Sequence, residues 1–356
     1  MIQVVDSEAT RLLVQELPVH IVVLMGGNSP EREISLASGQ AVAAALESRG
    51  HQVTLIDLDS VHDVMNLPQL QTADVVFPAL HGGQGEDGHL QALLEVLEVP
   101  YALSGPLPSA LAMNKGAAKR LMRGAGIPTP DWFLVAWDRV TGQPRNVSST
   151  DEREQIQPAP NDTLTVDHIR SRVITELGFP VVIKPNAAGS SVGVVIVKEA
   201  TAFATAFTKV ASRSQDVLLE KYVPGRELTA AIFLGRRLPL LEIRPRQGFY
   251  DYENKYTPGA SEYQVPAAVH SPVYEQISDD ALRTYDLLEC SGVVRIDFRL
   301  DGDDYYCLEV NTIPGMTDTS LVPKAAAAVG IEFAAMLEDL CRDALQRFQA
   351  DAPSRS

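Results

Sequence analysis

A hairpin near the end of the chain contains two acids whose spacing could hold a metal ion. Arg295 and Asp297 lie in one apolar-polar run, and Glu309 and Asn311 lie in the next. If a three-residue loop at Gly302–Asp304 closes the hairpin, Asp297 faces Glu309 and Arg295 faces Asn311, all on one face. Cross-strand neighbours have Cβ atoms ~5 Å apart and like charges there repel, so we expect a cation between them.

The ligand types favour magnesium. Carboxylate and amide oxygens suit Mg²⁺, which usually keeps waters and adds substrate phosphates. We therefore predict that Asp297, Glu309 and Asn311 bind metal; the alternative is a solvated polar face on which Arg295 neutralises one acid. The opposite face is apolar and should pack in the core through Ile296, Phe298, Leu308 and Val310.

A second segment carries features of an anion site. A short strand ends in Lys184, and a loop of small residues follows, including Gly189–Gly193. Such a loop can bring backbone N–H groups close to a triphosphate, although the Walker order is absent and a strand follows. We call the hairpin that carries Asp297, Glu309 and Asn311 the metal hairpin. Together with a metal ion bound there, Lys115 and Lys184 would supply the cations that phosphoryl transfer needs. Taken singly, each is a surface lysine and the loop is a tight hairpin without a ligand.

Two residues at the ends of strands allow two interpretations each. Glu31 follows a strand and a turn in which Asn28 or Ser29 is the expected cap of the next helix, with Pro30 in its first turn. It is either a first-turn acid favoured by the helix dipole or a carboxylate that receives an ammonium group. His81, before two glycines, is either structural or catalytic.

A tyrosine-rich segment, residues 247–264, contains four tyrosines, three of which lie with Lys255 between Gly248 and Gly259. Aromatic and basic groups on a loop with glycine hinges suggest a lid that excludes water from a site. A plain surface loop is the alternative.

The elements that must position these residues begin as an alternation of strand and helix. An apolar run at 20–25, a helical stretch at 34–49 and a second run at 52–58 predict a parallel βαβ unit. A third strand at 74–80 ends in a Gly-rich loop, where open α/β sheets bind ligands. Later elements are expected as one helix at 108–126, strands at 181–184, 192–198 and 217–222, a β-rich stretch at 227–243, a helix at 271–289, the hairpin and one final helix. Residues 140–166 are polar and are expected to form a surface insertion.

Composition excludes several classes of protein. The 356 residues include 30 Lys and Arg against 46 Asp and Glu, a formal charge of −16. Such a chain would repel nucleic acid and anionic membranes, so we expect small-molecule partners. No apolar run is long enough to cross a bilayer and the first residues are charged, which predicts a cytoplasmic protein. The three cysteines, in no metal-ligand spacing, are expected to be reduced packing residues.

Taken in order, these segments resemble the D-alanine:D-alanine ligase family of the ATP-grasp superfamily, over about residues 19 to 345. The stretches similar to its signatures are Gly26–Glu33, Leu80–Gly82 with Gly85–Gly88, Gly189–Gly193, Tyr250–Tyr256 and Leu308–Thr317. The resemblance implies an α/β, three-domain ATP-grasp fold, with an N-terminal parallel α/β sheet domain and two α+β domains that clasp ATP. The expected boundaries are an extension at 1–18, domains at 19–103, 104–220 and 221–348, the insertion at 140–166, a lid loop at about 246–264 and a tail at 349–356.

The resemblance also implies residue roles. It implies that ATP is bound by Lys115, Lys184, Ser190, Ser191, Glu220, Lys221, Val223 and Glu227, with Glu220 to Val223 at the adenine base. Two Mg²⁺ ions, or Mn²⁺, would be bound by Asp297, Glu309 and Asn311. Substrate would be bound by Glu31, His81, Lys255, Arg295, Ser320 and Leu321. The catalytic groups would be Glu31, Ser190, Tyr256, Arg295 and the backbone N–H of Gly315.

The implied activity is ATP-dependent ligation of two D-alanine molecules through an acyl phosphate, for peptidoglycan precursor synthesis, by a homodimer. A related ligase that uses D-serine or D-lactate as acceptor stays open. So does a nucleotide-binding regulator without catalysis, which intact lysines and acids at these positions disfavour.

Overall fold

The computed structural model describes residues 18–138, 141–144, 165–189, 193–246 and 260–350. The first part is a parallel sheet in the order β2-β1-β3, formed by β1 (His20–Gly26), β2 (Gln52–Leu58) and β3 (Val75–Pro78). Alternate residues of β1 enter different cores: Ile21 and Val23 pack with α1, while Val22 and Leu24 pack with α2. The helical elements here are α1 (Arg32–Ser48), η1 (Val61–Asn66), η2 (Pro68–Gln71), η3 (Gly83–Gly85) and α2 (His89–Val96).

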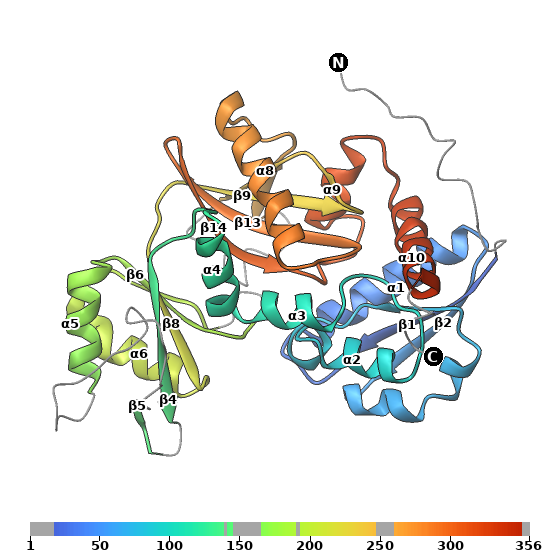
Figure 1. The fold of residues 1–356 in the computed structure, drawn as a ribbon, viewed down its shortest axis with the longest axis horizontal. Coiled ribbons are helices and arrows are strands. Elements are labelled where there is room, and N and C mark those ends of the chain that lie inside the picture. Colours follow the sequence, from blue (N-terminus) through green and yellow to red (C-terminus); the bar gives the residue numbers. More distant parts are fainter. Residues whose placement is uncertain (1–17, 139–140, 145–164, 190–192, 247–259, 351–356) are drawn as a thin grey trace.

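The middle of the chain forms a five-stranded antiparallel sheet in the order β5-β4-β8-β6-β7. Its strands are β4 (Trp132–Asp138), β5 (Gln143–Pro144), β6 (Val181–Pro185), β7 (Val195–Val197) and β8 (Asp216–Lys221). It is covered by α5 (Val166–Glu176) and α6 (Phe203–Ala211), whose apolar residues share one core with the strands; η4 (Ala200–Ala202) directly precedes α6. This unit lies at the opposite end of the molecule from the parallel sheet (Figure 1).

The last part is an antiparallel sheet in the order β12-β11-β9-β13-β14, with β10 paired to β9. Its strands are β9 (Arg226–Phe233), β10 (Arg236–Arg237), β11 (Leu241–Pro245), β12 (Ser261–Gln264), β13 (Val293–Asp301) and β14 (Asp304–Asn311). One core joins this sheet to α8 (Ser271–Leu287) and to α4 (Lys115–Gly124), which follows α3 (Pro106–Met113). After the sheet come α9 (Leu321–Ala327) and α10 (Phe333–Ala350).

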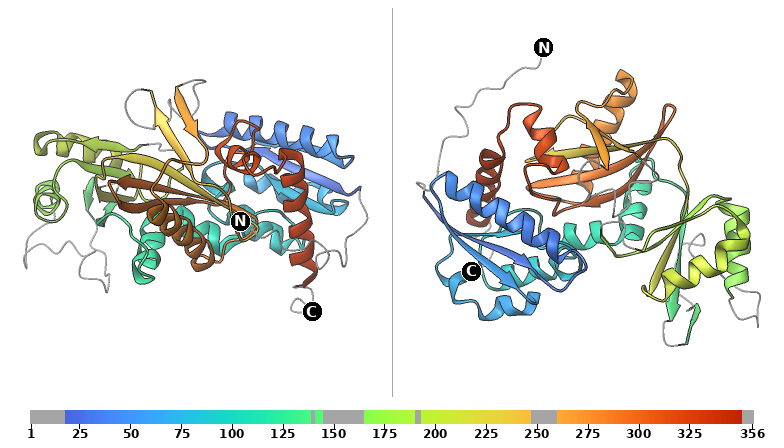
Figure 2. Two further views of the ribbon diagram at one scale, coloured as in Figure 1. Left: turned by 90° about the horizontal axis from the view of Figure 1, so that it is seen from above. Right: turned by 180° about the vertical axis from the view of Figure 1, so that it is seen from behind.

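The last helix returns to the first sheet. Buried residues of α10 share a core with β1 and α1, and Figures 1 and 2 show α10 beside α1. An ion pair between Arg49, just after α1, and the buried Glu338 of α10 joins the two helices. The N- and C-terminal parts are therefore held together by a core as well as by the chain between them.

Several expected elements differ from the structure. The helix expected over 108–126 is two helices, because Asn114 ends α3 and its side chain caps α4 by accepting from the Ala117 N–H (3.0 Å). Strand β4 and helix α5 were not expected, and β12 lies inside the segment expected to be only a loop. The final helix is also two helices, α9 and α10. No helix of the described residues is long and apolar enough to span a membrane.

The cap expected for the first helix was wrong. Helix α1 begins at Arg32 and Glu31 occupies its N-cap position, without a side-chain cap. Ser29 lies two residues before this N-cap position. Its hydroxyl accepts from the Glu31 N–H (3.1 Å) and donates to the His81 carbonyl (2.5 Å). The hydroxyl thus joins the two loops that carry Glu31 and His81.

Candidate active site

A cleft of about 290 Å³ is lined by residues from all three parts of the molecule. Its walls include α1, the Gly-rich loop after β3, the start of α4, the loop after β6 and the end of β14. Nine of the residues predicted as site residues line it: Glu31, His81, Lys115, Arg295, Glu309, Asn311, Gly315, Ser320 and Leu321. Ser190, Ser191, Lys255 and Tyr256 lie outside the described residues.

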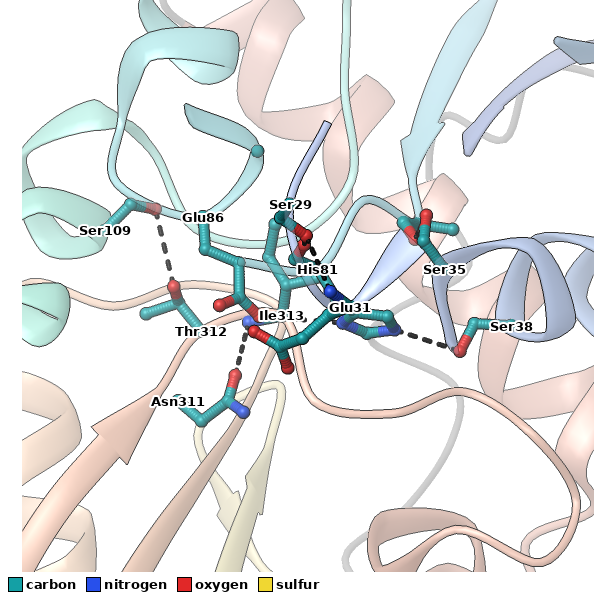
Figure 3. A network of polar contacts seen from close by, with 12 residues as sticks. Ser29, Glu31, Ser35, Ser38, His81, Glu86, Ser109, Asn311, Thr312 and Ile313 are labelled. Atoms are coloured by element: carbon teal, nitrogen blue, oxygen red, sulfur yellow. Dashed lines mark hydrogen bonds and ion pairs between the residues drawn. The ribbon is translucent and has the colours of Figure 1, made fainter. Parts of the chain in front are cut away.

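Glu31 and His81 lie together at one end of this cleft, and both are 5% exposed. The His81 Nε2 is 2.9 Å from the Ser38 hydroxyl, and its Nδ1 is 3.5 Å from a carboxylate oxygen of the buried Glu86 (Figure 3). Asn311 and Thr312 approach the same place from β14 (Figure 3). His81 is therefore oriented by a hydroxyl on one side and a carboxylate on the other.

Two glycines allow the chain to approach the Glu31 carboxylate. A Cβ added at Gly82 would lie 2.6 Å from the Glu31 Oε2, and one added at Gly189 would lie 2.5 Å from it. Real Cβ atoms do not approach an oxygen that closely, so both positions require glycine while Glu31 keeps this conformation. The loop after β6, from the middle part of the chain, thus packs directly on the acid of the first part.

The register of the hairpin confirms the predicted pairs: Asp297 lies opposite Glu309 and Arg295 opposite Asn311. The loop is shorter than expected, because Asp301 pairs with Asp304, and a bulge at Leu308 restores the register before Glu309. The core position expected for Leu308 is therefore wrong, and Cys307 takes it, fully buried.

Asp297 and Glu309 each have a cationic neighbour. Arg295 donates from Nε and Nη2 to the two oxygens of Asp297 (3.0 and 2.9 Å), and the Thr229 hydroxyl donates to the same carboxylate (2.7 Å). The Lys115 Nζ lies 3.3 Å from a Glu309 oxygen and donates to the Ala188 carbonyl (2.7 Å). The repulsion expected between the two acids is thus offset by Arg295 and Lys115.

The donor set fits a hard divalent cation. Two carboxylates on facing strands and the Asn311 amide are oxygen ligands of the kind Mg²⁺ takes when phosphates complete its shell. The Asn311 oxygen accepts from the Ile313 N–H (3.0 Å). No cluster of three or more His, Cys, Asp and Glu side chains suited to a metal occurs among the described residues, so this set relies on its amide and on outside ligands.

The start of α4 is fixed by Asn186 at the end of β6. The Asn186 amide oxygen accepts from the Gly116 N–H (2.8 Å), its NH₂ donates to Asn114 Oδ1 (2.9 Å), and its carbonyl accepts from the Lys115 N–H (3.1 Å). A Cβ at Gly116 would lie 2.6 Å from Leu134. These contacts determine where Lys115 enters the cleft.

Deeper in the middle part, Lys184 forms a buried ion pair with Glu220 (2.9 Å). Lys119, which is not among the predicted site residues, pairs with the other oxygen of Glu220 and is 0% exposed. Burial raises the pKa of Glu220, but the two ammonium groups outweigh it and the pKa is lowered. Burial lowers the pKa of Lys119, and Glu220 opposes this only in part. Its signal in the sequence was the four-residue spacing from Lys115, which puts both lysines on one face of α4.

The other residues predicted at the nucleotide site lie at the end of β8 and just after it. Lys221 is exposed and Val223 is buried. Arg299, also missed, donates to the Val223 carbonyl (3.2 Å) and to a Glu227 oxygen (3.1 Å). The sheet places Arg299 opposite Glu227 and Asp297 opposite Thr229, so the predicted nucleotide and metal residues lie along neighbouring strands.

Comparison with known proteins identifies the family. A family model described as D-ala D-ala ligase C-terminus matches residues 121–342, and one described as D-ala D-ala ligase N-terminus matches 60–104. The chain belongs to the D-alanine–D-alanine ligase family. It is 41% identical over 343 residues to a D-alanine–D-alanine ligase of Synechococcus sp. (strain JA-3-3Ab), covering 95% of this chain and 98% of that protein. It is 45% identical over 332 residues to one of Desulforudis audaxviator, covering 92% and 99%.

Solved structures of family members share this fold. The D-alanine–D-alanine ligase from Bacillus anthracis complexed with ATP superposes with a TM-score of 0.76 at 30% identity, covering 94% of this chain and all of that one. The ligase from Coxiella burnetii superposes with a TM-score of 0.74 at 26% identity, covering 94% and 98%. The predicted ATP-grasp fold is confirmed.

Proposed function

We propose that this member of the D-alanine–D-alanine ligase family joins two D-alanine molecules with consumption of ATP, giving D-alanyl-D-alanine, ADP and phosphate. The proposal rests on one observation. Glu31, Lys115 and Arg295 come from three separate parts of the chain and line the same cleft. This cleft offers a carboxylate for an ammonium group and cations for phosphates.

The reaction needs an activated acid, because a carboxylate and an amine do not condense unaided. A carboxylate oxygen of the first D-alanine attacks the γ-phosphorus of ATP, the bond to ADP breaks, and an acyl phosphate forms. Lys115 and Lys184 neutralise the phosphates, and Glu31 holds the ammonium group of this D-alanine beside His81. Mg²⁺ bound by Asp297, Glu309 and Asn311 would supply further positive charge at the phosphates.

In the second step the amine of the second D-alanine attacks the acyl carbon, loses a proton and displaces phosphate. Negative charge develops on the former carbonyl oxygen, where Arg295 and the Gly315 N–H are the proposed donors. Ser320 and Leu321, at the start of α9, are the proposed contacts of the second carboxylate. An acyl phosphate hydrolyses in water, so the residues proposed as a lid, with Lys255 and Tyr256, would exclude solvent.

Phosphate release tests the proposal. With ATP, Mg²⁺ and D-alanine we expect one phosphate for each D-alanyl-D-alanine formed, and no release with L-alanine. Release that is faster when D-serine or D-lactate is added with D-alanine would identify a different acceptor. ATP binding without release under any of these conditions would support a regulator and overturn the proposal. The homodimer and the cytoplasmic location stay predictions from the sequence.

A further inference from the structure

Lys119 is a fully buried lysine to which the reaction above assigns no role. It lies one helical turn after Lys115, in the middle of α4, and its side chain is 0% exposed. Taking an ammonium group out of water is costly unless it is paired and hydrogen-bonded. The partners of Lys119 should therefore explain its presence.

Those partners connect two elements of the proposed nucleotide site. The Lys119 Nζ pairs with Glu220 and donates to the Thr129 hydroxyl (2.6 Å). The Thr129 hydroxyl donates in turn to the Cys307 carbonyl (2.9 Å) on β14. A chain of three contacts thus runs from the carboxylate at the end of β8 to the metal hairpin.

The contact at Cys307 lies on the outer side of β14. Strand β14 is at the edge of its sheet, so within the described part of the chain one side of its backbone pairs with no strand. The segment before β4 contacts this side of the strand instead. The Cys307 N–H donates to the Pro128 carbonyl (2.8 Å), and the Cys307 carbonyl accepts from the Thr129 hydroxyl. Cys307 comes directly before the bulge at Leu308, which aims Glu309 into the cleft.

We propose that Lys119 and Thr129 are positioning residues that connect the purine end of the nucleotide site, at Glu220, to the metal hairpin, at Glu309. This inference rests on the proposed function, because it takes Glu220 as the residue that meets the base. Lys119 and Lys184 bind one oxygen each of Glu220 and keep it ionised, so the carboxylate can only accept hydrogen bonds. It accepts from the 6-amino group of adenine, whereas the 6-oxygen of guanine is repelled.

A first experiment removes the charge of Lys119 and keeps its length. We expect Lys119→Met to bind ADP without metal roughly tenfold or more weakly, the effect of losing a hydrogen bond to a charged group, and to prefer ADP over GDP less than the unchanged protein does. KM for D-alanine should stay within about twofold. Isothermal titration calorimetry with ADP and with GDP measures the two affinities. Lys209→Met, on the exposed side of α6, is the matched control.

A second experiment removes the link to the hairpin. Thr129→Val keeps the shape of the side chain and loses both hydrogen bonds, so Mg²⁺ should increase ADP affinity less than it does in the unchanged protein. Thr129→Ser restores the hydroxyl and should restore this increase. Thr175→Val, at a residue whose hydroxyl donates to the Ser171 and Arg172 carbonyls of the same helix α5, is the control.

Two results would overturn the inference. One is that Lys119→Met weakens ADP and GDP equally, which would show a purely structural role. The other is that Thr129→Val, folded as judged by thermal unfolding, keeps the full effect of Mg²⁺ on ADP binding. A protein that binds ADP as described but releases no phosphate with D-alanine would refute the proposed function and leave this inference standing.

Discussion

Gly189→Ala should disable the cleft with little loss of stability. The added Cβ would lie 2.5 Å from the Glu31 Oε2 and 3.4 Å from the Glu31 Cδ. Ordinary contacts begin near 3.4 Å, so the carboxylate must move by about 1 Å, and Gly82 already confines it on another side. The end of a flexible side chain can make that movement cheaply, so we expect the free energy of unfolding to change by less than about 1 kcal/mol. A catalytic group misplaced by about 1 Å can lose about 10²-fold in rate.

The assay is kcat/KM for D-alanine from coupled ADP release, together with the free energy of unfolding in urea. Gly124→Ala is the control, since a Cβ there meets nothing within 4 Å and the residue ends α4. We expect that control to keep full activity and to gain about 0.5 to 1 kcal/mol of stability. If Gly189→Ala keeps kcat/KM within threefold of the unchanged protein, the carboxylate of Glu31 does not need its observed position.

Three further predictions use other features of the structure. Glu309→Gln should reduce ADP formation at least 10²-fold even at saturating Mg²⁺, whereas the exposed control Glu332→Gln should not; near-normal turnover would exclude Glu309 as a metal ligand. Burial raises the pKa of Glu242, but hydrogen bonds from Arg226 and Arg244 outweigh it and lower the pKa to about 2. Its ionised form therefore stabilises the fold above its ordinary pKa of 4.5, and this stabilisation is lost as pH falls towards 2. The difference in unfolding free energy between the unchanged protein and Glu242→Gln should shrink over that interval, and a difference that is constant with pH would contradict it. Finally, all three cysteines are free and buried, with raised pKa values, so a thiol reagent should react with none in the native protein at pH 8 and with three after unfolding.

Local patterns predicted the first sheet well. The bounds of β1 and β2 follow from short apolar runs that are limited by turns; β1 is buried on both faces, whereas β2, at the edge of the sheet, is largely half-buried or exposed. The expected burial of the cysteines is also confirmed, and the three are not paired with one another. The break at Asn114 was harder to predict, since the apolar pattern continues through it and the cap depends on Asn186, which is far away in sequence.

Long-range contacts account for most of what the sequence did not reveal. The four-residue spacing of Lys119 from Lys115 indicates a shared helix face, but not that Lys119 is buried, because its burial depends on Glu220 and Thr129, which lie on other elements. The same holds for Arg299, which is oriented by the Val223 carbonyl and by Glu227. Glu86 was visible only as part of a Gly-rich stretch, although it lies 3.5 Å from His81. Spacing along the chain identifies a face of an element but not the element that will pack on it.

In the metal hairpin, the pairing of Asp297 with Glu309 was predicted correctly although the length of the loop was not, and burial explains why. A regular hairpin with the observed two-residue loop would place Glu309 opposite Ile296, on the face that packs in the core. Burying a neutral polar group without a partner already costs roughly 2 to 7 kcal/mol, and a carboxylate costs more. The bulge at Leu308 moves Glu309 to the other face and puts the small, apolar Cys307 into the core opposite Phe298. The pairing of Asp297 with Glu309 therefore depends on keeping charge out of the core, which is why it could be predicted although the length of the loop could not.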